Sequence, residues 1–273
     1  MRENNLNWRK AMRSTLPAIV AVLVVAAFPM GDLSLALAAD HMNLEEGIPV
    51  EIEDALPTAY RNIEIQGLFH WDREYNGDDR FTSEARLELG PFRNTQLEID
   101  VPFLWGDAVE EDGLGAVRLG ALYNFNQETL LVPAFALAGD LELPTNDESE
   151  GVDTTLKFIL TKTIGRSSVL QRIHVNGSWK HNSEAEGDER EDYYVAVAGY
   201  DVRVTPDTML IIDFVREQDE MKDEEASIVE VGLRYQLTPL TVLALGAGAG
   251  IGDESPDVRV MVGFQHSLTF LHF

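Results

Sequence analysis

The chain has 273 residues and no cysteine, and its 47 Asp and Glu against 21 Lys and Arg give a formal net charge of −26. Such an acidic chain is not suited to binding nucleic acid, whose phosphates require a basic surface. The lack of cysteine excludes disulfides and thiolate metal sites. The length is sufficient for one large β domain or two ordinary domains.

Residues 1–38 have the features of a cleavable signal peptide. Four basic residues precede an apolar run at residues 16–28, and residues 36–38 read Ala-Leu-Ala, where small residues suit cleavage. An uncleaved membrane anchor is the alternative, but it would need a span of about 20 apolar residues, and Pro17, Pro29 and Asp32 interrupt such a span here. We therefore expect export through the Sec pathway.

Residues 39–57 are acidic and show no regular periodicity. Their composition favours a periplasmic leader without fixed structure. A plug inside a barrel lumen is the alternative. The acids of this segment are Glu45, Glu46, Glu51, Glu53 and Asp54.

From residue 58 to the end, apolar and polar residues alternate with the period of two that is typical of β-strands. In residues 227–237, Val231 and Leu233 share one face with Val229, while Glu230 and Arg234 share the other. We predict twelve strands, at residues 59–73, 80–90, 94–105, 113–125, 129–143, 152–164, 171–181, 192–204, 207–217, 226–238, 240–251 and 257–270.

The connections between these strands fall into two alternating sets. Short turns are expected at residues 90–94, 126–128, 165–168, 205–207 and 238–240, and longer acidic loops at 74–79, 106–113, 146–151, 182–191, 218–225 and 252–256. Strict alternation places every short turn at one end of the strands and every acidic loop at the other. This polarity predicts an all-β fold, a transmembrane antiparallel up-and-down barrel of about twelve strands in the bacterial outer membrane, formed by residues 58–273.

A soluble sandwich would also alternate, with its apolar faces buried against each other. Aromatic residues near the predicted strand ends favour the membrane barrel, because aromatic girdles lie at its two interfaces. These residues are Trp71, Trp105, Tyr123, Trp179, Tyr235 and Phe270.

The inward faces of the predicted strands carry charged and polar side chains that we expect to line the lumen. Paired across a narrow barrel they would close it, and held apart they would leave a polarised channel. The predicted lumen-lining residues are Glu64, Glu84, Arg86, Glu88, Glu98, Asp100, Arg118, Asp140, Lys157, His174, Lys180, Asp201, Arg203, Asp213, Glu230, Arg234 and Arg259.

The predicted strand at residues 240–251 has no charged face, and Gly246, Gly248 and Gly250 would point inward. Glycines in a strand mark curvature or the close approach of another segment. Room for large neighbouring side chains is the interpretation we favour here, and room for residues 39–57 is the alternative.

Four short motifs resemble the outer-membrane family associated with the phenol meta-degradation pathway, whose members are described as transporters. The motifs lie at residues 54–60, 113–120, 133–145 and 257–264, and the resemblance covers about residues 54–273. They read Asp-Ala-Leu-Pro-Thr-Ala-Tyr, Gly-Leu-Gly-Ala-Val-Arg-Leu-Gly, Pro-Ala-Phe-Ala-Leu leading to Leu-Pro-Thr, and Asp-Val-Arg-Val-Met-Val-Gly-Phe.

This resemblance implies aromatic or hydrophobic substrates and a C-terminal aromatic residue, Phe273 or Phe270, recognised by the outer-membrane insertion machinery. Two positions depart from the family pattern: Ala116 stands where Asp is usual, and Asn146 where Gly is usual. A ligand site shared with the family therefore does not follow from the resemblance.

Two sets of residues offer chemical alternatives to a channel. His181, Asn182 and Ser183 offer the residue types of a lipid hydrolase, but three consecutive residues do not readily converge in triad geometry. The acidic loop with Asp219, Glu220, Asp223, Glu224 and Glu225 could hold Ca²⁺ weakly, although a solvated run of charge is favoured.

The sequence thus predicts a monomeric outer-membrane channel or transporter for small solutes, without cofactor, metal site or catalytic residues. Its acidic loops should concentrate cations at the mouth. Expected partners are membrane lipid, lipopolysaccharide and the solute. A closed structural barrel that bridges lipopolysaccharide through divalent cations, and a lipid hydrolase, remain as alternatives.

Overall fold

The computed structural model describes residues 39, 41–109, 112–145, 151–165, 169–185, 187–222, 224–252 and 254–268. The chain divides into two compact units, and all described residues belong to the second, Ala36–Phe273. The signal peptide predicted at residues 1–38, Phe270 and Phe273 lie outside the described residues.

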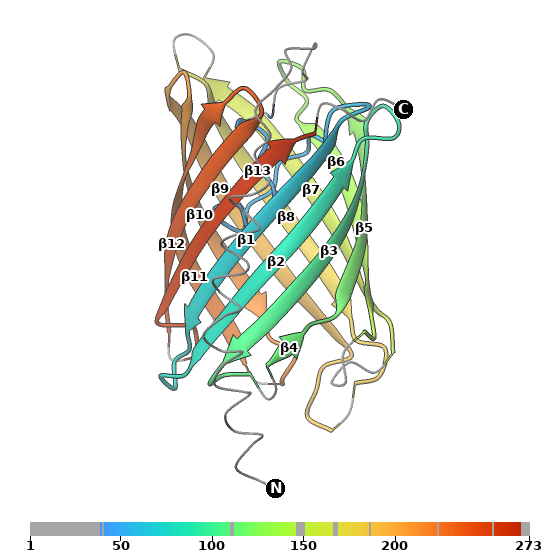
Figure 1. Cartoon of the computed structure of the whole chain (residues 1–273), viewed down its shortest axis with the longest axis vertical. Helices are drawn as coiled ribbons and strands as arrows, with labels where there is room; N and C mark the ends of the chain where they lie inside the picture. The colour runs from blue at the N-terminus through green and yellow to red at the C-terminus, as the bar shows by residue number, and fades with distance from the viewer. Residues whose placement is uncertain are drawn as a thin grey trace, which may run out of the picture. The chain divides into compact units, whose positions relative to one another are not determined.

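The described residues form one antiparallel sheet that closes into a barrel (Figure 1). β1 pairs with β13 on one side and with β2 on the other, and β2 pairs with β3, so the ring is complete. The predicted fold of a closed twelve-stranded barrel is confirmed. Its long strands are β1 (Ile63–Arg73), β2 (Asp79–Leu89), β3 (Thr95–Gly106), β5 (Val117–Asn126), β6 (Ala134–Leu143), β7 (Asp153–Gly165), β8 (Gln171–His181), β9 (Asp192–Thr205), β10 (Thr208–Gln218), β11 (Glu225–Thr238), β12 (Thr241–Gly250) and β13 (Val258–Ser267).

Three boundaries differ from the prediction by four residues or more. β1 begins at Ile63 because residues 59–62 form a turn, in which the Asn62 amide donates to the Ala59 carbonyl and Arg61 has a φ of 66°. A similar turn at residues 129–132 delays β6. The strand expected at 113–125 is split into a two-residue strand, β4 (Gly113–Leu114), paired with β3, and β5.

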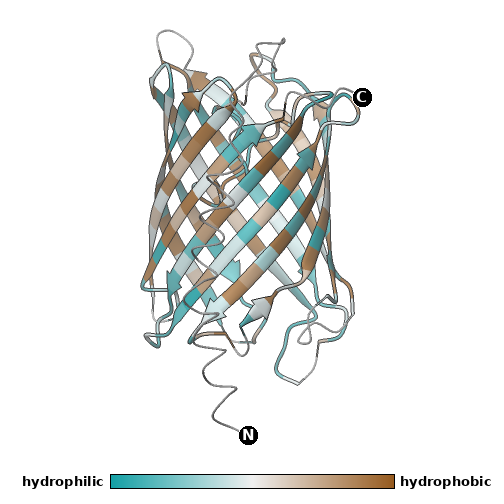
Figure 2. Cartoon of the chain, viewed as in Figure 1, coloured by the Kyte–Doolittle hydropathy of each residue, from teal (hydrophilic) through white to brown (hydrophobic). Residues whose placement is uncertain are grey.

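The barrel is apolar outside and charged inside, the inverse of a soluble core. Val231, Leu233 and Leu245 are 46%, 44% and 56% exposed, whereas Asp201 and Arg234 are fully buried. Along the strands, hydrophilic and hydrophobic residues alternate (Figure 2). Because a strand directs successive side chains to opposite sides, the apolar ones form a continuous outer surface suited to lipid.

Aromatic side chains cluster on the barrel exterior at both strand ends. Toward the acidic-loop end, Phe81 stacks between Trp71 and Trp105, with ring centroids 6.5 and 5.6 Å apart. Toward the short-turn end, Phe125 contacts Tyr123 and stacks on Phe135 at 5.0 Å. Aromatic residues at these levels are typical of the two interfaces of an outer-membrane barrel.

Among the described residues, no helix is both long enough and apolar enough to cross a membrane.

Candidate functional site

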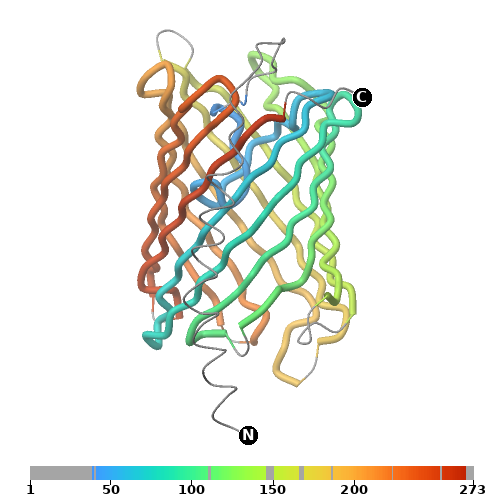
Figure 3. Tube along the Cα trace, viewed as in Figure 1, coloured from blue at the N-terminus to red at the C-terminus, as the bar shows by residue number. Residues whose placement is uncertain are grey.

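Residues 41–58 lie inside the barrel, in the half nearer the short turns (Figure 3). The Ala39 amide donates to the Pro239 carbonyl in the turn between β11 and β12 at 3.0 Å. Further on, the amide of Thr58 donates to the Gln96 side chain of β3 at 2.8 Å. The interpretation favoured from composition, a free segment without fixed structure, is therefore wrong for these residues.

An apolar inner wall explains part of this placement. Leu44, Val50 and Ile52 of the segment are 1% exposed and pack in one cluster with inward-facing side chains of β9, β10, β11 and β13. Burying such side chains stabilises the docked segment by about 1.5–3 kcal/mol each as an upper estimate. The wall residues of this cluster are Val197, Met209, Ile211, Val215, Ala226, Ile228 and Met261.

Inward-facing glycines make room for the segment. A Cβ added at Gly246 would lie 1.9 Å from the Pro49 carbonyl oxygen, and one at Gly232 would lie 2.3 Å from the Pro49 ring. Side chains at these positions would collide with residues 48–50. The interpretation that we favoured for the strand glycines, room for neighbouring side chains, fails at Gly246, where the docked segment occupies the space.

Charged wall residues satisfy the backbone of this irregular segment. Amides of Glu51 and Ile52 donate to Glu230 and Asp213 at 2.9 and 2.8 Å. The guanidinium of Arg234 donates to the carbonyl of Ile48 at 2.9 Å. A buried segment without strand partners needs such bonds, because an unpaired buried peptide group is costly.

Ion pairs fix the same segment to wall cations. Lys157 of β7 contacts Glu46 and, at 2.7 Å, Glu53. Arg259 of β13 contacts Glu51 at 3.3 Å. The acids of the segment thus neutralise bases that would otherwise face an empty lumen.

Glu46 and Glu53 share Lys157, and the pKa values of their two carboxyl groups differ. Burial raises the pKa of Glu53 to about 7, because Lys157 offsets only part of the desolvation and the Glu46 carboxylate adds repulsion. Burial also disfavours charge on Glu46, but Lys157 and Arg118 outweigh it and hold the pKa of Glu46 below its usual range. Glu46 is therefore the ionised partner, and Glu53 titrates near neutral pH.

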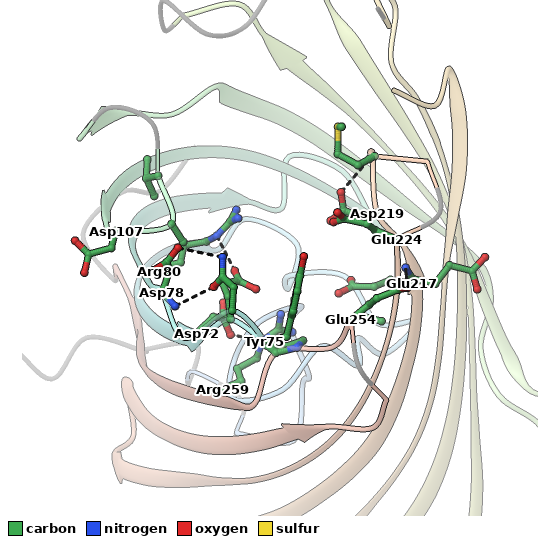
Figure 4. A pocket seen from close by; sticks show the side chains of 18 residues that line it. Asp72, Tyr75, Asp78, Arg80, Asp107, Glu217, Asp219, Glu224, Glu254 and Arg259 are labelled. Carbon is green, nitrogen blue, oxygen red and sulfur yellow. Dashed lines mark hydrogen bonds and ion pairs between the residues drawn. The ribbon is translucent and has the colours of Figure 1, made fainter. Parts of the chain in front are cut away.

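A vestibule of about 540 Å³ opens among the acidic loops (Figure 4). Nine carboxylates and two guanidinium groups line it, which makes its potential negative. Its charged lining comprises Asp72, Glu74, Asp78, Arg80, Asp107, Glu217, Asp219, Glu224, Glu225, Glu254 and Arg259.

An inner cavity of about 270 Å³ lies between this vestibule and the docked segment. It shares Glu217 and Arg259 with the vestibule, and Glu46, Gly47 and Glu51 of the segment contribute to its lining. The inner cavity therefore adjoins the vestibule and is floored by Glu46, Gly47 and Glu51 of the segment.

The residues predicted to line the lumen occupy two different environments. Seven of them line the inner cavity: Glu84, Arg86, Arg118, Asp140, Lys157, Lys180 and Arg259. Others are buried against residues 41–58 or against each other instead of facing open space, and they include Glu64, Glu88, His174, Asp201, Asp213, Glu230 and Arg234.

Several predicted residues are brought together in pairs, within a strand or across neighbouring strands. Arg86 contacts Asp100 at 3.0 Å and Glu84 at 2.9 Å, and Arg118 contacts Asp100 at 2.7 Å. Glu98 accepts a bond from the Gln96 side chain. The side chain of Arg203 makes no ion pair with any described residue. That the lumen-lining residues conduct a solute stays a prediction.

Arg172 is the main residue that sequence reasoning missed. It is buried on β8 and bonds to Asp201 of β9 and to Asp54 of the segment. Its inward phase, two residues before His174, was visible in the sequence. Its partner Asp54 was not, because 118 residues separate them.

The residues of the hydrolase alternative do not form a triad. The His181 ring bonds to Asp192 at 3.0 Å, while the Ser183 hydroxyl accepts from the Val152 amide at 3.0 Å. No hydrogen bond joins His181 to Ser183 in the described part of the chain. Within that part, no group of three or more His, Asp or Glu side chains has a geometry that could hold a metal ion, and Asp223 lies outside it.

Neither a model of a known protein family nor a curated protein matches this sequence. Solved structures do resemble the fold. The crystal structure of an outer membrane channel from Pseudomonas putida F1 has a TM-score of 0.63 at 14% identity, over 80% of this chain and all of that one. The NanC porin has a TM-score of 0.55 at 9% identity, over 76% of this chain and 100% of that one. The KdgM porin has a TM-score of 0.53 at 12% identity, over 75% of this chain and 99% of that one.

These similarities, together with the apolar exterior and the charged interior, show that the chain has the fold of a bacterial outer-membrane β-barrel. Identities this low establish the fold alone, so the activity has to be argued from the lumen.

Proposed function

We propose that the protein is an outer-membrane channel that admits small solutes from the acidic-loop side and is closed toward the short-turn side by residues 41–58. The observation that carries this proposal is the inner cavity, which adjoins the vestibule at Glu217 and Arg259 and is lined at its inner end by Glu46, Gly47 and Glu51. A barrel that only bridged lipopolysaccharide would have no need of a polar cavity next to its mouth.

The proposed selectivity is for cations at the entrance. Nine carboxylates against two guanidinium groups in the vestibule raise the local cation concentration and repel anions. Because the proposed path narrows to an inner cavity of about 270 Å³, the solutes must be small unless the segment moves.

Support from similar proteins is limited to architecture. One KdgM structure is described as a complex with disordered oligogalacturonate, and we propose solute passage by analogy with that barrel, not the same substrate. The resemblance to the phenol meta-degradation family suggests a distant relationship and aromatic solutes. We also propose that the protein has no catalysis of its own, in keeping with the separate bonding of His181 and Ser183.

Single-channel recording of the purified protein in planar bilayers tests the proposal. We expect a small conductance with a cation-to-anion permeability ratio above one. A total lack of current from correctly folded protein, at every pH and voltage, would contradict the channel function, and a preference for anions would contradict its electrostatic part.

A further inference from the structure

We propose that the inner cavity is a binding site for a protonated primary amine carrying a small apolar group, with Asp140 as the acceptor of the ammonium. This inference deepens the proposed function and depends on it for the route by which the solute arrives. The binding itself is a property of the folded barrel.

Asp140 is the centre of the argument. Its side chain lines the cavity from β6 and the residue is only 6% exposed. No hydrogen bond or ion pair joins its carboxylate to any residue within the described ranges. Lys157, the nearby cation, is already held by Glu46 and Glu53. This carboxylate faces the cavity, so a ligand that supplies N–H groups there would give it the hydrogen bonds that no described residue provides.

Further oxygen-bearing side chains line the same cavity. Thr155 of β7 is directly opposite Asp140 in the sheet register. Ser178 and Asn176 of β8 also line the cavity. Asn176 is 3% exposed, and its Oδ1 has no hydrogen-bond partner. An ammonium offers three N–H donors, which matches a carboxylate flanked by oxygen acceptors.

Part of the cavity wall is apolar. Val195 and Val197 of β9 and Val215 of β10 line it, one and two strands beyond Ser178 and Asn176. A volume of about 270 Å³ lies just below the range of about 300–1,000 Å³ that is common for drug-sized ligands. The site therefore suits a compact solute with a cationic end toward β6 and an apolar end toward β9 and β10.

The charge balance favours an amine over a carboxylate. Three lining carboxylates, on Asp140, Glu142 and Glu217, make no ion pair with the described residues. Among the lining bases, Lys180 is unpaired in the same sense, and its ammonium lies 5.7 Å from the centre of the Tyr193 ring. The acidic vestibule above would also exclude anions before they reached the cavity.

Three ring compounds of similar size and different charge test the proposal: benzylammonium, benzyl alcohol and benzoate. Calorimetric titration of the full-length protein in detergent micelles measures their affinities without any membrane. We expect benzylammonium to bind at least about tenfold more tightly than benzyl alcohol, and benzoate to bind most weakly.

The variants D140N and T155V test whether Asp140 and Thr155 bind the ammonium group. D140N should abolish the advantage of benzylammonium over benzyl alcohol, and T155V should weaken benzylammonium alone, by about two- to fivefold. D207N, in an exposed turn between β9 and β10, is the matched control and should bind as the wild type does. Heat-dependent migration in gels verifies that each barrel is folded. If D140N does not fold, T155V alone tests the site.

Equal affinity for benzylammonium and benzyl alcohol, tighter binding of benzoate, or an unchanged preference in folded D140N would each overturn the inference. Loss of conductance with intact benzylammonium binding would refute the channel and leave the site standing. Conductance without benzylammonium binding would refute the amine site and leave the channel standing.

Discussion

The guanidinium of Arg172 lies 2.8 Å from the carboxylate of Asp54, joining β8 to the segment inside the barrel, and neither side chain is more than 5% exposed. The same guanidinium bonds to Asp201 of β9 and to the Met42 carbonyl. One wall cation thus holds both ends of a stretch, residues 42–54, whose middle floors the inner cavity.

Replacing Arg172 by Met should loosen the segment. Removal of one partner from a buried ion pair leaves an uncompensated charge on Asp54 and costs about 3–5 kcal/mol. We expect a larger and noisier single-channel conductance in R172M. R203M is the control, because Arg203 is half-buried on β9 and its side chain has no ion pair with the described residues; equal conductance in the two variants would argue against the tether.

Adding a methyl group at Gly246 should also displace the segment. A Cβ there meets the Pro49 carbonyl oxygen at 1.9 Å, so backbone has to move. Overpacking of this kind costs about 1–3 kcal/mol. G246A should therefore raise conductance, whereas G177A should not, because no atom lies within 4 Å of a Cβ at Gly177. A closed G246A channel with a fully docked segment would contradict the close fit.

The strands and their faces were predictable from sequence because alternation is local. Val231 and Leu233 show their outward phase within five residues of chain, and predicted short turns fall where β9 and β11 end. The turns that shorten β1 and β6 were missed, because residues 59–62 and 129–132 adjoin alternating runs and contain no glycine or proline that would mark a turn.

The docked segment was not predictable in the same way. Many of its contacts join residues more than 100 positions apart, such as Ala55 with Thr161 and Glu51 with Glu230. The sequence signal for a docked segment lay in the barrel wall that the segment covers, not in the segment itself. Met209 and Ile211 are apolar on the inward face of a strand whose outward face is apolar as well, so an additional segment had to cover them.

Acid should strengthen closure. Burial raises the pKa of Glu53, in the segment before the first strand, to about 7, above about 4.3 for a free glutamate. The docked state therefore binds this proton more tightly, and its stabilisation is full below pH of about 4 and lost as the pH rises to 7. Burial also raises the pKa of Asp54, so protonation of Asp54 favours the docked state as well.

We expect conductance to rise between pH 5 and pH 7.5 in the wild type and to change less in E53Q, which is neutral throughout. D207N should keep the wild-type dependence. A conductance that fell over this range, or an E53Q profile identical to the wild type, would refute the assignment to Glu53.

Neutralising vestibule acids should reduce cation preference. Asp219 and Glu254 line the vestibule, so D219N and E254Q together remove two of its nine carboxylates. The permeability ratio should fall in 0.1 M salt and hardly change in 1 M salt, because the Debye length shortens from about 10 Å to about 3 Å. D207N, at the opposite end of the strands, should leave the ratio unchanged, and an equal effect there would show that the mouth does not set selectivity.

The most direct test of the whole account is the single-channel conductance of a variant that lacks residues 41–56, compared with the wild type in the same bilayer. Folding of both barrels is verified by heat-dependent gel migration. Because the segment fills the half of the barrel nearer the short turns, we predict a severalfold larger, cation-preferring conductance in the shortened variant. No current from a folded shortened barrel would contradict the proposed channel.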